Sequence, residues 1–170
     1  MLEINYNKVF QKDITNSLAD AFVAMLIKQR KVRNPNAKRV KACLSLCICY
    51  IDAEIVGIGA IKPKTSTDFS YSKANLPALE KEFEWELGYC FTEPKYQKRG
   101  LSSNVVRILM ADFINHNIMA TTELRADNSM QRILERNGFR QYGQPWKSSI
   151  HDDIIGLFLR FSTALNTFNP

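Results

Sequence analysis

The sequence predicts an α/β (α+β) fold in which helices flank both faces of a mixed sheet. Two observations lead to this prediction. Two strand-like runs over residues 42–50 and 55–61 are joined by a short turn, which is the pattern of a β-hairpin. Beyond residue 83, segments with strand periodicity alternate with segments whose apolar residues recur at helical spacing. Alternation of that kind packs helices on a sheet that is partly parallel.

Length and composition are those of one globular domain. The chain has 170 residues, of which 45% are hydrophobic, so we expect a single domain over residues 1–170. It contains no apolar run of about 18 residues that could span a bilayer. The N-terminus also lacks the basic-then-apolar pattern of a signal peptide, so we expect a soluble, cytoplasmic protein.

The cysteines and histidines do not form the pattern of a metal site. Three of the four cysteines fall in one apolar run, where neighbours on one strand face cannot bridge, so we expect buried free thiols. No pair of C-x-x-C units is present, and His116 and His151 each stand alone in the sequence. We therefore expect no metal.

The first part of the chain is expected to form a strand and a helix. Residues 2–6 can make a short edge strand. Asp13 or Thr15 can cap the helix after it, because their side-chain oxygens accept from the first free amides. Four apolar residues recur at helical spacing: Leu18, Phe22, Met25 and Leu26. The Asn-Pro-Asn sequence at residues 34–36 is expected to end this region.

A basic segment overlaps the end of this helix. Residues 28–41 carry seven cations and no acid: Lys28, Arg30, Lys31, Arg33, Lys38, Arg39 and Lys41. Cations are favourable at a helix C-terminus, so a solvated helix end explains the segment without a ligand. The alternative is a docking surface for an acidic substrate, a phosphate or RNA. The first explanation is favoured, because the segment lacks the aromatic residues of a single-strand-binding surface.

Residues 63–79 are polar and irregular, and they interrupt the sheet as a long loop. We expect a helical turn within this region at residues 77–81. Long loops inside compact domains are functional or disordered, and this composition allows both. We expect a flap on the substrate side.

The next strand, over residues 83–92, alternates between two kinds of side chain. One face carries Trp85, Leu87, Tyr89 and Phe91, and the other carries Glu84, Glu86, Gly88 and Cys90. The first face is expected to be core. Two carboxylates on so apolar a strand indicate either the wall of a cleft or an ordinary solvated face.

Residues 96–102 lie at a strand-to-helix turn and indicate a phosphate site. Gly100 allows close approach of the backbone, and the amides of the first helical turn have no internal partners. The spacings of nucleoside triphosphate loops and dinucleotide fingerprints are absent, which indicates another phosphate-bearing cofactor. An ordinary polar turn remains the alternative. The helix after this turn has its apolar face at Leu101, Val105, Ile108, Leu109 and Phe113.

The last part of the chain is expected to contain three strands and a helix. The strands are predicted over residues 118–126, 139–142 and 154–161. Asn128 is expected to cap the helix, with Gln131 in capping-box spacing and Asn137-Gly138 as the stop.

Together, the segments from Glu86 to Phe139 resemble the GNAT superfamily of acyl-coenzyme A-dependent N-acyltransferases. The residues that carry the resemblance are the strand 86–92, the turn 93–96, the loop 97–102, and the segments 125–128 and 134–139. The loop matches the family pattern Q/R-x-x-G-x-G/A except that Ser102 replaces the final small residue. The resemblance implies a GNAT-like, mostly antiparallel central sheet of about six or seven strands.

The resemblance also implies a site for acetyl-CoA. In the family, amides of the loop and the helix start bind the pyrophosphate, and the end of the preceding strand pairs with the pantetheine arm. The helix-capping asparagine approaches the cofactor. The implied residues here are Cys90, Phe91, Thr92, Gln97, Lys98, Arg99, Gly100, Leu101, Ser102, Ser103 and Asn128.

For catalysis, the resemblance offers more than one general base. Glu86 lies eleven residues before Gln97, as does the base of GNAT histone acetyltransferases, and it ranks first. Glu84 is the reserve, and Glu123 matches the base of ribosomal-protein alanine acetyltransferases. The backbone amide of Phe91 or Thr92 is the expected oxyanion donor.

One departure concerns the general acid. Leu134 stands where many family members have a tyrosine, as in subfamilies that release the thiolate without it. Tyr89 and Tyr142 could substitute, although core packing is the expected role of both.

The resulting hypothesis is an N-acetyltransferase that moves an acetyl group from acetyl-CoA to a primary amine. One alternative is a protein or aminoacyl-tRNA acceptor docked on residues 28–41. Another is a non-catalytic acyl-CoA-binding module. A membrane partner is not expected, nucleic acid is not favoured, and a homodimer is left open.

Overall fold

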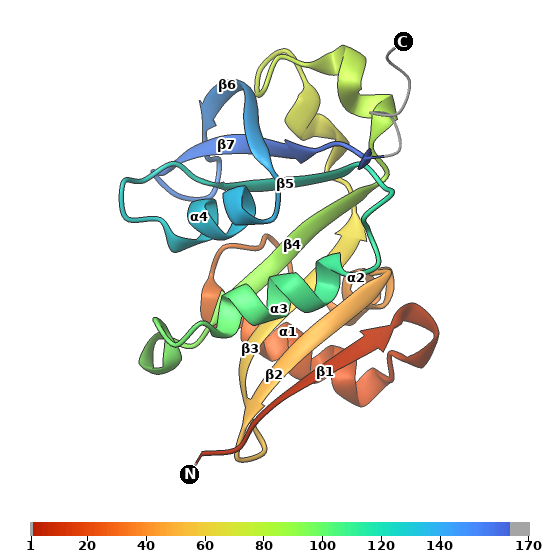
Figure 1. Ribbon diagram of the computed structural model, residues 1–170, viewed down its shortest axis with the longest axis vertical. Coiled ribbons are helices and arrows are strands. Elements are labelled where there is room, and N and C mark those ends of the chain that lie inside the picture. Colours follow the sequence, from red (N-terminus) through yellow and green to blue (C-terminus); the bar gives the residue numbers. More distant parts are fainter. Residues whose placement is uncertain (1, 164–170) are drawn as a thin grey trace. The chain divides into compact units, whose positions relative to one another are not determined.

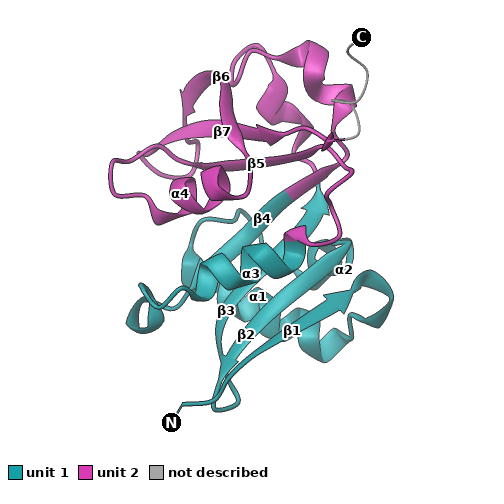
Figure 2. Ribbon diagram, in the orientation of Figure 1, with its two compact units in different colours: residues 1–63, 87–109 teal, residues 64–86, 110–170 magenta. Residues whose placement is uncertain are grey.

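The computed structural model describes residues 2–163 of the chain and contains a seven-stranded mixed sheet (Figure 1). The strand order is β1-β2-β3-β4-β5-β7-β6. The chain forms two compact units, residues 1–63 with 87–109 (unit 1) and residues 64–86 with 110–170 (unit 2), shown in teal and magenta in Figure 2. The expected mixed sheet is confirmed, because β4–β5 pairs parallel, whereas β1–β2, β2–β3, β5–β7 and β6–β7 pair antiparallel.

Unit 1 contains three neighbouring antiparallel strands, β1 (Ile4–Phe10), β2 (Ser45–Ile51) and β3 (Glu54–Pro63). The turn between β2 and β3 consists of Asp52 and Ala53, which both have positive φ, at 48° and 68°. Two such residues give the turn the twist that an antiparallel hairpin needs. The predicted hairpin is therefore confirmed.

Helices α1 (Asn16–Gln29) and α3 (Leu101–Met110) pack on opposite faces of these strands (Figure 1). On one face, Phe22 of α1 joins a buried cluster that includes Ile58 of β3. On the other, a side-chain carbon at Gly59 of β3 would lie 2.6 Å from Val105 of α3. Neighbouring residues of β3 thus meet different helices, as strand alternation requires.

The caps of α1 and of the next helix decide how the early chain folds. Thr15 caps α1 by accepting from the amide of Leu18, as predicted. The Asn-Pro-Asn sequence was expected only to end the region, and this was incomplete. Asn36 accepts from the amide of Arg39 and so starts a short helix, α2 (Ala37–Lys41).

Unit 2 is built on β5 (Ile118–Glu123), β7 (Ile154–Arg160) and β6 (Arg140–Lys147). The first residues of β4 (Trp85–Thr92) pair parallel with β5. Helix α4 (Ser129–Arg136) comes after β5. Its cap at Asn128 is confirmed, but the expected capping box is wrong, because the Gln131 side chain donates to Glu135 instead.

The long polar segment after β3 is folded into unit 2. It contains two 3-10 turns, Ser66–Phe69 and Pro77–Glu82, and the second confirms the helical turn predicted at residues 77–81. Phe69 and Ala74 are buried in a cluster that includes Leu157 of β7. The disordered alternative for this loop is therefore wrong.

The helices of the described chain are short or amphipathic. Across residues 2–163, none combines the length and the apolar character needed to cross a membrane.

Candidate functional site

Strand β4 is distorted in its second half by a residue with left-handed backbone. Tyr89 has φ of 56°, which is uncommon for a residue with a side chain and marks a strained position. Its ring packs edge-on against Phe22 of α1, at 6.2 Å between centroids, and Lys62 Nζ lies 5.4 Å from its centroid. The core role expected for Tyr89 is thus the one seen.

Beyond this distortion, the end of α1 is tied to β4. The side-chain amide of Gln29, the last residue of α1, donates to the carbonyl oxygen of Cys90 at 3.0 Å. Lys28 forms an ion pair with Glu93 at 2.5 Å. The Cys90 thiol lies on the other face, beside Gly59 and α3, and burial raises its pKa to about 12. It is therefore a protonated, unreactive thiol near neutral pH.

The loop that leads into α3 has an open, exposed backbone. Lys98 and Gly100 both have left-handed φ values, 61° and 77°. A side-chain carbon placed on Gly100 would meet nothing within 4 Å, so the glycine is required by conformation and not by crowding. Lys98 and Arg99 are exposed. The loop can therefore present amides and two cations to an anion.

Two contacts close this loop onto the end of β4. The hydroxyls of Ser102 and Thr92 form a hydrogen bond of 2.7 Å, and Thr92 is buried. The Gln97 side-chain amide donates to the Thr92 carbonyl oxygen at 3.1 Å. Ser102, the residue that departs from the family pattern, therefore fits the turn and has its hydroxyl satisfied by the protein.

The outer part of the loop is anchored to the β2–β3 turn. Glu54 accepts from Lys95 at 3.2 Å and from the Tyr96 hydroxyl at 3.1 Å. The hydrogen bond from Lys95 lowers the pKa of Glu54, and the same bond raises the pKa of Lys95. Arg99 lies over the Tyr96 ring at 5.5 Å. The loop is thereby held on a rigid hairpin.

Glu86 is a buried carboxylate in β4, with 5% of its surface exposed. Its Oε2 accepts from the backbone amide and from the hydroxyl of Thr65, both at 2.8 Å. Glu84 has different surroundings, because β4 begins after it and its side chain is exposed. Thr65 was not identified from the sequence, because it lies in a polar loop with no motif.

Glu123 belongs to a charged cluster in unit 2. Its carboxylate lies 3.3 Å from the Arg125 guanidinium and 3.8 Å from His151 Nε2. Asp153 pairs with both Arg125 and His151. His151 was expected to stand alone, and this is wrong, because the chain brings it between two carboxylates. Ligand-type atoms of Glu123, His151 and Asp153 lie within 4.8 Å of one another, but Arg125 already pairs with both acids.

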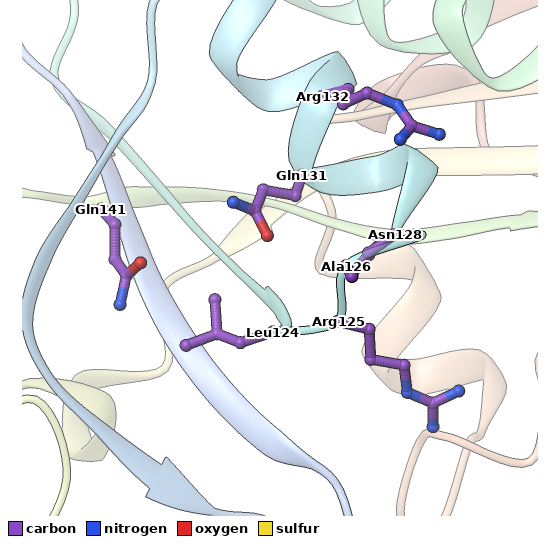
Figure 3. Close-up of a pocket in the computed structure, with 7 residues that line it drawn as sticks. All are labelled: Leu124, Arg125, Ala126, Asn128, Gln131, Arg132 and Gln141. Atoms are coloured by element: carbon purple, nitrogen blue, oxygen red, sulfur yellow. The ribbon is translucent and has the colours of Figure 1, made fainter.

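Asn128 is bonded on all sides within its own unit. Its Oδ1 accepts from the amide of Met130, and its Nδ2 donates to the Thr122 hydroxyl and to the Glu123 carbonyl oxygen. A pocket of about 470 Å³ opens at this turn (Figure 3). Arg125 and Arg132 both line it, Arg125 from the turn and Arg132 from α4, and their guanidinium groups lie well apart in the view.

The residues considered for the general acid differ in their surroundings. Leu134, at the position of the family tyrosine, is buried. Tyr142 lies edge-on to Phe161, at 5.5 Å between ring centroids, but it is 36% exposed, so the core role expected for it is wrong. Tyr89 packs on Phe22.

Several solved structures share the fold. An acyl-CoA N-acyltransferase from Pseudomonas aeruginosa has a TM-score of 0.63 and 9% identity, covering 93% of this chain and 99% of its own. Arabidopsis thaliana NAA60, solved with a bisubstrate analogue, has a TM-score of 0.63 and 13% identity, covering 95% and 99%. A GNAT acetyltransferase from Streptococcus pneumoniae has a TM-score of 0.60 and 13% identity, covering 94% of this chain and 99% of its own. At these identities the likeness shows the fold alone.

Sequence comparison adds the family. A search of curated proteins gave no match. The family model described as "Acetyltransferase (GNAT) family" matches residues 12–139, which is most of the chain and includes β4, the loop and α4. The chain therefore belongs to the GNAT family of acetyltransferases.

Proposed function

We propose that the protein transfers an acetyl group from acetyl-CoA to a primary amine by direct attack. Family membership establishes acyl transfer in general, whereas the acetyl donor, the acceptor and the base are our proposal. The observation that supports it most is Glu86. A buried carboxylate is oriented by two hydrogen bonds from Thr65, and its strand leads into a loop suited to phosphate.

Three features of unit 1 support a site for coenzyme A. Gly100 has a left-handed backbone with open space beside it, and Lys98 and Arg99 add positive charge. We propose that the backbone from Lys98 to Ser103 binds the pyrophosphate of coenzyme A, with Gln97 closing the loop. Cys90, Phe91 and Thr92 would pair with the amides of the pantetheine arm, as an added strand does.

In unit 2, Asn128 is assigned the capping role first. Both of its side-chain groups already have partners, so contact with the cofactor would add to a role that is structurally complete.

Acetyl-CoA would supply a thioester whose carbonyl carbon is open to attack. Glu86 would accept the proton that the amine loses as the new nitrogen–carbon bond forms. The backbone amide of Phe91 or Thr92 would donate to the carbonyl oxygen as it gains charge. The carbon–sulfur bond would then break, and the proton held by Glu86 would pass to the leaving thiolate, directly or through water. The products of the reaction would be one amide and one free thiol.

The other candidate bases are less suited to this role. The Glu123 carboxylate already interacts with Arg125 and His151, so it is less available to accept a proton from a substrate. Glu84 is exposed, where a carboxylate is well solvated and its hydrogen bonds compete with water. We therefore rank Glu86 above both.

Two measurements test the proposal. Calorimetry with acetyl-CoA tests binding, and a thiol-release assay over a panel of primary amines tests transfer. We expect saturable binding and release of one thiol per amide formed. Absence of binding at millimolar acetyl-CoA would overturn the proposal. Tight binding without turnover on any amine would favour the non-catalytic module. This alternative is included because Leu134 stands where many family members have the tyrosine that acts as general acid.

A macromolecular acceptor is a second candidate, supported by the basic segment 28–41. Its seven cations are all exposed, and the helix end that begins it is tied to β4 through Gln29 and Lys28. An acidic protein or aminoacyl-tRNA docked there would make KM rise steeply with salt. Neutralising Arg30, Lys31 and Arg33 should abolish that dependence but leave a small-amine acceptor unaffected.

A further inference from the structure

The side chain of Gln29 has an unusual hydrogen-bond inventory. Its Nε2 donates to the Cys90 carbonyl oxygen at 3.0 Å. Its Oε1 is buried, and among residues 2–163 no group donates to it. Buried side-chain oxygens almost always have a donor, so this one calls for an explanation.

We propose that Gln29 is a ligand-positioning residue, whose Oε1 accepts a hydrogen bond from an N–H group of a molecule bound at the end of β4. Two sources of such an N–H are present in the reaction: the acceptor amine and the amides of the pantetheine arm. The inference rests on the proposed function and extends it, because it assigns a contact that the family motifs do not include.

The orientation of the amide supports this assignment. Exchanging the nitrogen and oxygen of Gln29 would place two oxygens against each other at the Cys90 carbonyl, which is unfavourable. The donor must therefore face Cys90, and the oxygen must face away from it. The unpartnered atom is thus fixed as an acceptor and can take only a donor.

The surroundings make Gln29 rigid enough to position a ligand. Helix α1 stops directly after it, at Arg30 with a left-handed φ of 60°. The neighbouring Lys28 pairs with Glu93, the residue directly after β4, so two consecutive residues of α1 are held at this end of the strand. The contacted stretch comes after the left-handed residue Tyr89 and contains Cys90, one of the residues proposed to bind pantetheine. The Gln29 side chain is fixed at its base by the helix and near its tip by the hydrogen bond to Cys90, so it loses little conformational freedom when a ligand binds.

The substitution Gln29→Met tests the proposal, because methionine keeps the length and removes both polar groups. Gln29→Glu is the second variant, since it keeps an acceptor oxygen. Gln11→Met is the matched control: Gln11 also donates from its side chain to a backbone carbonyl, that of Lys41, but it is exposed. Melting temperature and circular dichroism establish that each variant is folded.

The readouts are the acetyl-CoA Kd by calorimetry, and kcat and KM for the amine. If the amine is the donor, Gln29→Met raises its KM about tenfold with a smaller change in kcat. If pantetheine is the donor, the acetyl-CoA Kd rises about tenfold instead. In either case Gln29→Glu recovers part of the loss, and Gln11→Met changes neither constant.

Unchanged Kd and KM in Gln29→Met would overturn the inference, because the oxygen would then be satisfied by water. Equal losses in Gln11→Met would also overturn it. If the wild type binds acetyl-CoA but acetylates no amine, the proposed function fails separately. Pantetheine is then the remaining source of the N–H group, so the acetyl-CoA Kd of Gln29→Met decides the inference, and an unchanged Kd overturns it.

Discussion

The hydroxyl oxygens of Thr92 and Ser102 lie 2.7 Å apart, which joins the end of β4 to the first turn of α3. We expect Ser102→Ala to lower the free energy of unfolding by about 1–2 kcal/mol, because it leaves the buried Thr92 hydroxyl without this partner. The acetyl-CoA Kd should change less than about threefold. Urea unfolding and calorimetry measure the two effects. A tenfold weaker Kd with unchanged stability would show that the hydroxyl serves the ligand instead.

Replacement of Glu86 tests its assignment as the base. Glu86→Gln keeps the shape but cannot accept the proton, so kcat should fall by about 10²- to 10³-fold. The acetyl-CoA Kd should stay within about threefold, because the role is chemical. Steady-state kinetics and calorimetry separate the two quantities.

Two variants control for that experiment. Thr65→Val removes the hydroxyl that orients Glu86 and should lower kcat by about tenfold without moving the Kd. Glu84→Gln changes an exposed carboxylate near the same strand and should have little effect. Full activity in Glu86→Gln would place the base elsewhere.

The contacts that anchor the loop before α3 predict an effect on acetyl-CoA affinity that depends on salt. Glu54→Gln weakens the contacts to Lys95 and Tyr96, so the loop becomes less ordered and the acetyl-CoA Kd should rise about twofold to threefold. The difference from wild type should shrink at high salt, which screens exposed pairs. Glu135→Gln, an exposed change in unit 2, is the control and should bind acetyl-CoA as wild type does.

The buried thiols predict a loss of stability at alkaline pH. Burial raises the pKa of Cys43 and Cys47 to about 12, above the ordinary value of 9.0. Below pH 9 both states keep these protons. Between pH 9 and 12 the unfolded chain loses them while the folded chain retains them, so stability falls as pH rises through this window.

Urea midpoints between pH 8 and 11 measure this effect. The double variant Cys43→Ala with Cys47→Ala should lose less stability over that range, although it is less stable throughout because of the cavities. A chromogenic disulfide should not react with these thiols at pH 8 in the folded protein, since the thiolate is the reactive form. Rapid reaction of the folded protein would contradict the burial argument.

Local signals predicted most elements of the fold. Thr15 and Asn128 each cap the helix that the sequence indicated, and the β2–β3 hairpin forms where two strand-like runs meet. The short helix α2 was missed, because the Asn-Pro-Asn sequence was interpreted only as the end of the preceding region. In the structure the Asn36 side chain accepts from the amide of Arg39 and so caps a new helix. The folding of residues 64–83 was also missed, because it depends on distant residues such as Leu157.

The candidate site shows the same division. Gly100 and Glu86 lie in motifs that are continuous in the sequence, so they were predicted. Thr65 lies 21 residues from its partner Glu86, and Gln29 lies 61 residues from Cys90. No spacing rule links positions that far apart, and only the folded chain reveals these contacts.

The close approach between residues 64–86 and β6 determines how a protease meets this protein. A side-chain carbon at Gly143 would lie 2.2 Å from the Ala74 carbonyl oxygen, and the amide of Gln144 donates to that same oxygen. Two of the trypsin sites in this stretch, Lys64 and Lys73, are paired with Glu80 and Asp68. Composition alone marks the segment as easily cleaved. Because the segment is part of the packed unit, trypsin is expected to cleave at Lys64 and Lys73 only after that unit unfolds locally.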